Sequence, residues 1–76
     1  MQKVYVEWWD ACSDTKNDWT PVKEATGVLS LCYSLGWIVK ETPESITVAG
    51  HTDDKYEDFC GEIVIPTVCI KKIEYL

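Results

Sequence analysis

The sequence contains no arginine, and its seven lysines stand against thirteen acidic residues, which gives a net charge of -6. Proteins that bind nucleic acid rely on Lys and Arg to neutralise phosphates, so this charge argues against DNA or RNA as the partner. A local basic patch can still form around Lys71 and Lys72, with Lys40 as a third member. The acidic excess also suits docking on a basic partner, or solubility alone.

No basic segment followed by an apolar one opens the chain, and no run of eighteen apolar residues occurs. Neither a secretion signal nor a membrane span is therefore indicated, and we expect a cytoplasmic protein. The cysteines form no C-x-x-C pair, and their intervals match no zinc-binding pattern. In a reducing compartment we expect free, mostly buried thiols at all four positions, which are Cys12, Cys32, Cys60 and Cys69.

Phosphate-binding glycine loops, the G-x-S-x-G elbow and the calcium loop are all absent, so no cofactor is predicted. The only histidine, His51, stands close to Asp53 and Asp54, and this is the one cluster that resembles a hard-metal or hydrolase site. A solvated loop between two strands accounts for the same residues.

The first element is a strand over residues 3–10, KVYVEWWD, in which Val4, Val6 and Trp8 share the core face. The other face then carries Tyr5 and Trp9, which are either half-exposed or covered by another element. Residues 10–18 are polar and rich in turn formers, and they are predicted to form a loop.

A helix is predicted over residues 21–35, because apolar side chains recur there on one broad arc. Thr20 can cap its start and Pro21 suits the first helical position. Gly36 is expected to end the helix in a left-handed conformation, with Trp37 packed back on the last turn. Gly27 costs such a helix about 1 kcal/mol, which indicates a close approach to a neighbouring backbone.

The second half of the chain is expected to be rich in β-structure, with one acidic segment that lacks periodicity. The expected elements are a hairpin (residues 37–42 and 45–50), the acidic segment (51–60), a strand (61–66), a 3₁₀ turn (67–70) and a short final strand (72–76).

These elements predict a single domain, residues 1–76, of the α+β class with the order β-α-β-β-β-3₁₀-β. The architecture is either a small, strongly bent antiparallel sheet or a partly open five-stranded barrel with one helix after the first strand. A strand, a 3₁₀ turn and a final strand also end the small barrels of the SH3-like and Sm-like types, which the closing residues 61–76 resemble.

The chain is rich in aromatic residues, with four Trp, four Tyr and one Phe in 76 residues. Trp8 and Trp9 are neighbours on a strand and must point to opposite faces, so one of them meets a surface other than the core. Tyr and Trp are enriched at interfaces. The pattern favours a self-associating protein, unless the predicted helix covers Trp9.

In overall pattern the chain resembles the short uncharacterised proteins that bacteriophages encode. The segments that carry this resemblance are residues 6–10 (VEWWD), 36–41 (GWIVKE), 46–50 (ITVAG) and 61–66 (GEIVIP). Small phage proteins of this size are often accessory: many bind and inactivate a host factor, and some sequester the nucleotide signals of host defence.

The resemblance implies a non-enzymatic binding protein, a phage accessory or counter-defence factor that acts as a homo-oligomer on a host protein or a small nucleotide. Ligand pockets at subunit junctions would use lysines to meet phosphate and aromatic residues to stack a base. The expected site residues are Tyr5, Trp9, Trp37, Lys40, Lys71 and Lys72. The alternatives are a Sm-like nucleic-acid binder and, third, a metal-dependent hydrolase that uses His51, Asp53 and Asp54.

Overall fold

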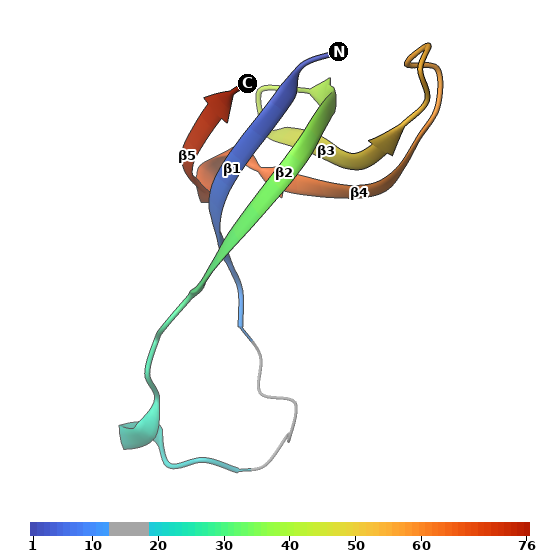
Figure 1. The fold of residues 1–76 in the computed structure, drawn as a ribbon. Helices are drawn as coiled ribbons and strands as arrows, with labels where there is room; N and C mark the ends of the chain where they lie inside the picture. The colour runs from blue at the N-terminus through green and yellow to red at the C-terminus, as the bar shows by residue number, and fades with distance from the viewer. Residues whose placement is uncertain (13–18) are drawn as a thin grey trace.

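A computed structural model describes residues 1–12 and 19–76, and the chain in these ranges forms one five-stranded antiparallel sheet (Figure 1). The strands lie in the order β4-β3-β2-β1-β5, so β4 and β5 are the two edges. The elements are β1 (Lys3–Asp10), η1 (Val22–Glu24), β2 (Ser30–Glu41), β3 (Ser45–Thr52), β4 (Phe59–Pro66), η2 (Thr67–Cys69) and β5 (Ile70–Tyr75), where η marks a 3₁₀ turn.

The first strand is confirmed with its predicted bounds, and its alternation decides which face is buried. Val4 and Val6 are fully buried and Trp8 is 9% exposed, whereas Tyr5 is half-buried and Trp9 is exposed. Because strand side chains alternate between faces, one face of β1 forms the core and the other faces outward.

The helix predicted over residues 21–35 is wrong, and so is the α+β class. Only η1 makes a helical turn there, and β2 begins at Ser30. Residues 30–37 pair with the whole of β1, from Asp10↔Ser30 to Lys3↔Trp37. This ladder pairs backbone groups of residues 30–37 with those of β1 and sorts the side chains of β2 onto two faces, which a helix at this position cannot do.

The two glycines of the mispredicted helix have other roles. Gly36 lies inside β2 and ends no helix, and a Cβ atom there would stand 2.2 Å from the carbonyl oxygen of Ala49. Gly27 has a positive φ of 63°, and a Cβ atom added there would have no neighbouring atom within 4 Å. The close backbone approach expected at Gly27 therefore occurs at Gly36. Trp37 lies in β2 opposite Lys3 rather than against a helix end.

The C-terminal half largely follows the prediction. The hairpin is confirmed, since β2 pairs antiparallel with β3, and the 3₁₀ turn η2 links β4 to β5. The final strand begins at Ile70, two residues earlier than expected, and it pairs with β1. The acidic segment 51–60 is not wholly irregular, because its two ends belong to β3 and β4.

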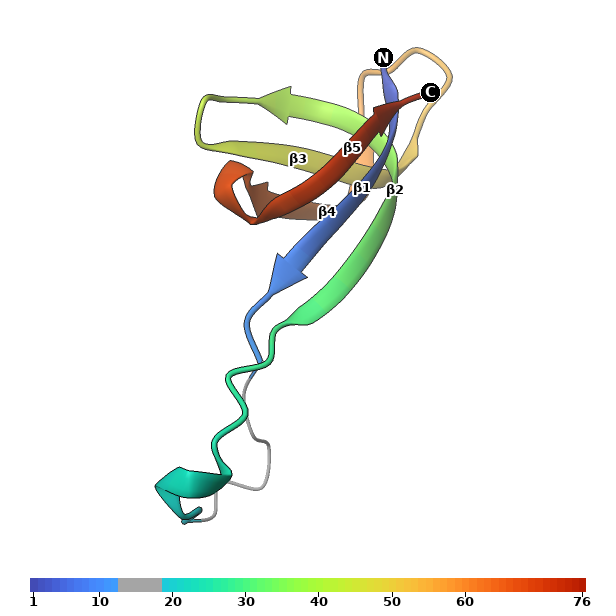
Figure 2. The ribbon, with the colours of Figure 1, turned by 90° about the vertical axis from the view of Figure 1, so that its left-hand side faces the viewer.

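The sheet is strongly bent, and side chains from β1, β3 and β4 meet in one buried core (Figure 2). The side chains that pack there are apolar, and partly buried neighbours on β2 and β5 extend the cluster. Among the described residues no ladder joins β4 to β5, so the sheet is not closed. The buried cluster consists of Val4, Val6, Trp8, Ile46, Val48 and Ile65.

Beyond the sheet, the chain between β1 and β2 projects as an arm, by which we mean residues 11–12 and 19–29 (Figures 1 and 2). The molecule measures 53 × 22 × 19 Å, and its radius of gyration is 15.9 Å. A compact chain of this length has a radius of gyration of about 11 Å. Within the described ranges, no helix is long and apolar enough to cross a membrane.

Candidate functional site

The surface of β2, β1 and β5 that points away from the core is called the outer face here. The registers of these strands place alternate residues side by side on it, such as Tyr5 opposite Leu35 and Glu7 opposite Tyr33. A bulge between Glu7 and Trp8 shifts the β1–β5 pairing by one residue and adds Lys71 to this face. Its members are Leu31, Tyr33 and Leu35 from β2, Tyr5, Glu7 and Trp9 from β1, and Lys71, Lys72 and Glu74 from β5.

Two tyrosines stack at the centre of the outer face. The rings of Tyr5 and Tyr33 lie 6.4 Å apart at an interplanar angle of 8°. The Tyr5 hydroxyl donates a hydrogen bond of 2.6 Å to Glu7 Oε2, and this bond, with partial desolvation, raises the pKa of Tyr5 to about 12. Tyr5 is thus held by its partners, while Tyr33 and Leu35 remain 64% and 67% exposed.

The charges of the outer face are balanced locally. Lys71 Nζ lies 5.5 Å from the ring centroid of Trp9, a cation–π geometry. Lys72 Nζ lies 3.0 Å from Glu74 Oε1, and the hydrogen bond to Glu74 raises the pKa of Lys72. With Glu7, the face carries two lysines and two glutamates, so its net charge is zero on a chain of -6.

The structure divides the predicted site residues into two groups. Tyr5, Trp9, Lys71 and Lys72 share the outer face. Lys40 pairs with Thr47 of β3, beyond the part of β2 that pairs with β1, and it is exposed.

Trp37 is half-buried; it lies two residues beyond Leu35 on the same side of β2 and lines a hollow of about 380 Å³ near the chain termini, together with Lys3, Leu35, Gly50 and Leu76.

Sequence reasoning missed Tyr33 and Leu35, which complete the outer face. Both were placed in the predicted helix, although the alternation of Leu31, Tyr33 and Leu35 with Cys32 and Ser34 is the period of a strand. That alternation was the signal that could have found them.

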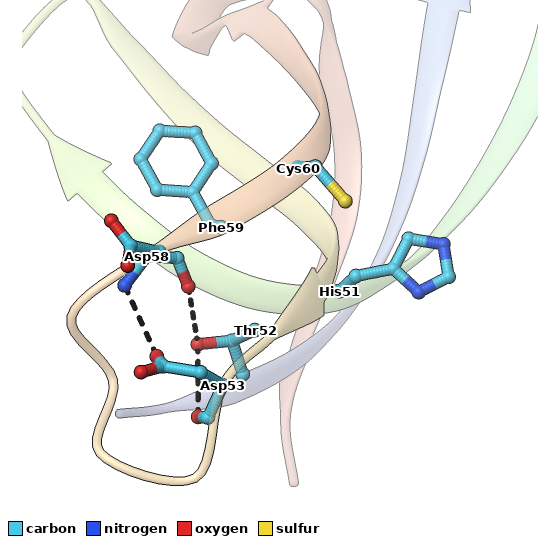
Figure 3. Close-up of a pocket in the computed structure, with 6 residues that line it drawn as sticks. All are labelled: His51, Thr52, Asp53, Asp58, Phe59 and Cys60. Carbon is cyan, nitrogen blue, oxygen red and sulfur yellow. Dashed lines mark hydrogen bonds between the residues drawn. The ribbon is translucent and has the colours of Figure 1, made fainter.

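The cluster around the histidine lies where β3 ends and β4 begins, beside a hollow of about 400 Å³ (Figure 3). Asp53 Oδ1 accepts the backbone N–H groups of Glu57 at 2.8 Å and Asp58 at 3.1 Å, and these bonds hold the pKa of Asp53 below its ordinary value of 3.8. In Figure 3 the imidazole of His51 points away from the Asp53 carboxylate. The two groups do not form an acid–base pair.

Asp54, the third member of the cluster, is exposed in the same loop. In the part of the chain that the structure describes, no group of three or more His, Cys, Asp or Glu side chains is arranged to hold a metal ion. The carboxylate of Asp53 instead closes the loop between β3 and β4.

Replacing Asp53 with alanine is expected to release the amides of Glu57 and Asp58 at neutral pH. A carboxylate whose folded-state pKa is lowered stabilises the loop above the unfolded-state value, and that contribution is lost as pH falls through the folded-state value. In the wild type the same two amides should therefore lose their hydrogen bonds only in acid, below 3.8. Amide chemical shifts and hydrogen exchange measured by NMR across pH check both statements.

Asp54→Ala is the matched control, since this neighbour accepts neither of the two backbone hydrogen bonds. If the amide chemical shifts and exchange rates of Glu57 and Asp58 are unchanged in Asp53→Ala, the carboxylate does not close the loop.

All four cysteines are free. Cys32 and Cys69 are half-buried and Cys12 and Cys60 are exposed, so the expectation of mostly buried thiols is wrong. Cys12 Sγ lies 3.1 Å from Ser30 Oγ at the base of the arm.

Comparison of the chain with protein-family models, with curated proteins and with solved structures found no match.

Proposed function

We propose that this chain is a small non-enzymatic binding protein that acts as a homo-oligomer and uses its outer face to contact its partner. The observation that carries the proposal is the outer face itself, where stacked and exposed aromatic side chains lie among charged groups that already have partners on this face. A partner that covers this face desolvates little unpaired charge and buries Tyr33 and Leu35. These properties favour a protein surface as the partner.

The size of the exposed surface supports the homo-oligomer. The accessible surface of the chain is 6042 Å². A monomeric protein of 8.7 kDa exposes about 4,700 Å². The difference, about 1,300 Å², exceeds the roughly 800 Å² that each partner buries in a standard interface.

We further propose that the bent sheet is a partly open barrel of the SH3-like or Sm-like type. Its strand order and the 3₁₀ turn η2 between β4 and β5 support this reading. Sm-type proteins form rings by pairing their outer strands, and β4 and β5 are the edges of this sheet. The resemblance to phage proteins supports an accessory or counter-defence role directed at a host protein.

A second candidate ligand is a small nucleotide, and one contact favours it. Lys71 stands over the ring of Trp9, so a base that stacks on the indole would bring its phosphate close to Lys71 and Lys72. Lys72 is already paired with Glu74, so it would contribute less than Lys71 to binding a phosphate.

Light scattering on size-fractionated protein is expected to give a mass of at least twice 8.7 kDa. In the same preparations, a cyclic dinucleotide at about 100-fold excess should raise the melting temperature if the second candidate holds, because a ligand of the native state stabilises it. That rise should vanish in Lys71→Gln and persist in Lys55→Gln, a lysine of the exposed β3–β4 loop.

A monomer at every concentration would overturn the homo-oligomer. An unchanged melting temperature with the nucleotide would remove the second candidate and leave the protein partner.

A further inference from the structure

The arm carries several strongly exposed apolar side chains, and one of them, Trp19, is the most exposed large apolar residue in the part of the chain that the structure describes. Trp19 is fully exposed, and Val22 is 90% exposed. Val28 and Leu29 follow at 69% and 54%. A tryptophan buries 150–250 Å² when it packs, so full exposure of one at the end of a projecting arm indicates a contact made outside this copy of the sheet.

A hollow of about 460 Å³ opens at the other side of the fold, between the β2–β3 turn and the start of β5. Ile46, Ile70 and Ile73 line it with apolar surface. Glu41 and Tyr75 also line it, and the Tyr75 hydroxyl donates a hydrogen bond of 3.3 Å to Glu41 Oε1. Its volume falls within the range of small-ligand sites, about 300–1,000 Å³, so an indole fits inside.

The chemistry of the two features is complementary. An indole offers a broad apolar ring and one N–H group that can only donate. The hollow offers isoleucine side chains for the ring and the Glu41 carboxylate as an acceptor. Glu41 is the only charged residue in its lining.

The geometry points to an exchange between copies: we propose that Trp19 of one copy inserts into this hollow of a second copy. The inference rests on the proposed homo-oligomer and names its contact. The arm points away from its own sheet (Figures 1 and 2). The Trp19 indole that enters this hollow therefore comes from another copy of the chain.

Charge also favours a second copy as the occupant. Residues 19–29 contain one lysine and one glutamate, so this segment is neutral although the chain carries -6. Two copies that repel each other elsewhere can therefore approach through this segment. A contact between two different surfaces gives a finite assembly when two copies insert their arms into each other, or when several copies form a ring.

The test compares Trp19→Ser, Thr67→Trp and the control Val64→Ser by sedimentation across concentration. Thr67 lies at the hollow and is exposed, so a tryptophan there fills the space that the arm needs. Val64 is an exposed apolar residue of β4 outside both features, and pairing of the β4 edge would use its backbone N–H and C=O groups, which serine retains. Losing a buried anchor should raise the self-association Kd at least about tenfold in the first two variants and leave the control unchanged.

A direct readout is an intermolecular NOE between the Trp19 indole and the Ile73 methyl groups, in a mixture of labelled and unlabelled protein. An oligomer that keeps its Kd in Trp19→Ser and shows no such NOE overturns the arm exchange while the homo-oligomer stands. An equal loss in Val64→Ser also overturns it, because it indicates nonspecific apolar contact. A wild-type monomer overturns both proposals.

Discussion

Alanine at position 8 is expected to destabilise the fold by about 3–5 kcal/mol, the cost of truncating a buried tryptophan. Trp8 is 9% exposed and packs in the core cluster with Val6 and Ile65. Its indole N–H donates a hydrogen bond of 3.0 Å to Ser34 Oγ, which ties β1 to β2. Since small domains are stable by about 5–15 kcal/mol, this single change removes a large share of the total.

The adjacent Trp9 provides a matched control. It is 37% exposed on the opposite face, where Lys71 Nζ lies 5.5 Å from its ring centroid. Trp9→Ala loses a cation–π contact of about 0.5–1 kcal/mol and part of its burial. Urea unfolding followed by circular dichroism should therefore give a much lower midpoint for Trp8→Ala than for Trp9→Ala. Similar midpoints would contradict the assignment of core and outer faces.

The strand β1 could be predicted from the sequence because its alternation is strict over eight residues and fits no other period. Residues 21–35 fit two periods. Their apolar positions 22, 25, 28, 29, 32 and 35 lie on one arc of a helix, while residues 30–36 also alternate. The outcome depends on pairing with β1, a long-range contact that no local pattern contains.

The same limit applies to the outer face. That Trp8 and Trp9 point to opposite sides follows from adjacency on a strand and was predictable. That Lys71 reaches Trp9 depends on the bulge between Glu7 and Trp8, which shifts β5 by one residue. Tyr33 was missed because its strand was mispredicted as a helix. The β1–β2 register is what brings its ring against that of Tyr5.

Gly36→Ala is expected to cost about 3 kcal/mol or more, at the upper end of what overpacking costs in a core. The added methyl group would stand 2.2 Å from the carbonyl oxygen of Ala49, which is too short for any non-bonded contact, and 3.1 Å from Val48 Cγ1. The first of these atoms belongs to the backbone, so no rotation of a side chain relieves the clash. β2 pairs with β1 on one side and β3 on the other, and separating β2 from β3 breaks the ladder at Trp37↔Ala49.

Gly50→Ala separates this clash from the general effect of removing a strand glycine. Gly50 lies in β3, and the nearest atom to a Cβ built there is the carbonyl oxygen of Gly61 at 3.8 Å, an ordinary contact. Alanine there restricts the unfolded chain without strain, so stability should stay level or rise by about 0.4–1 kcal/mol. Denaturant unfolding of both variants checks the difference, and an equally stable Gly36→Ala protein would mean that β2 and β3 do not approach as closely as the ladder between them requires.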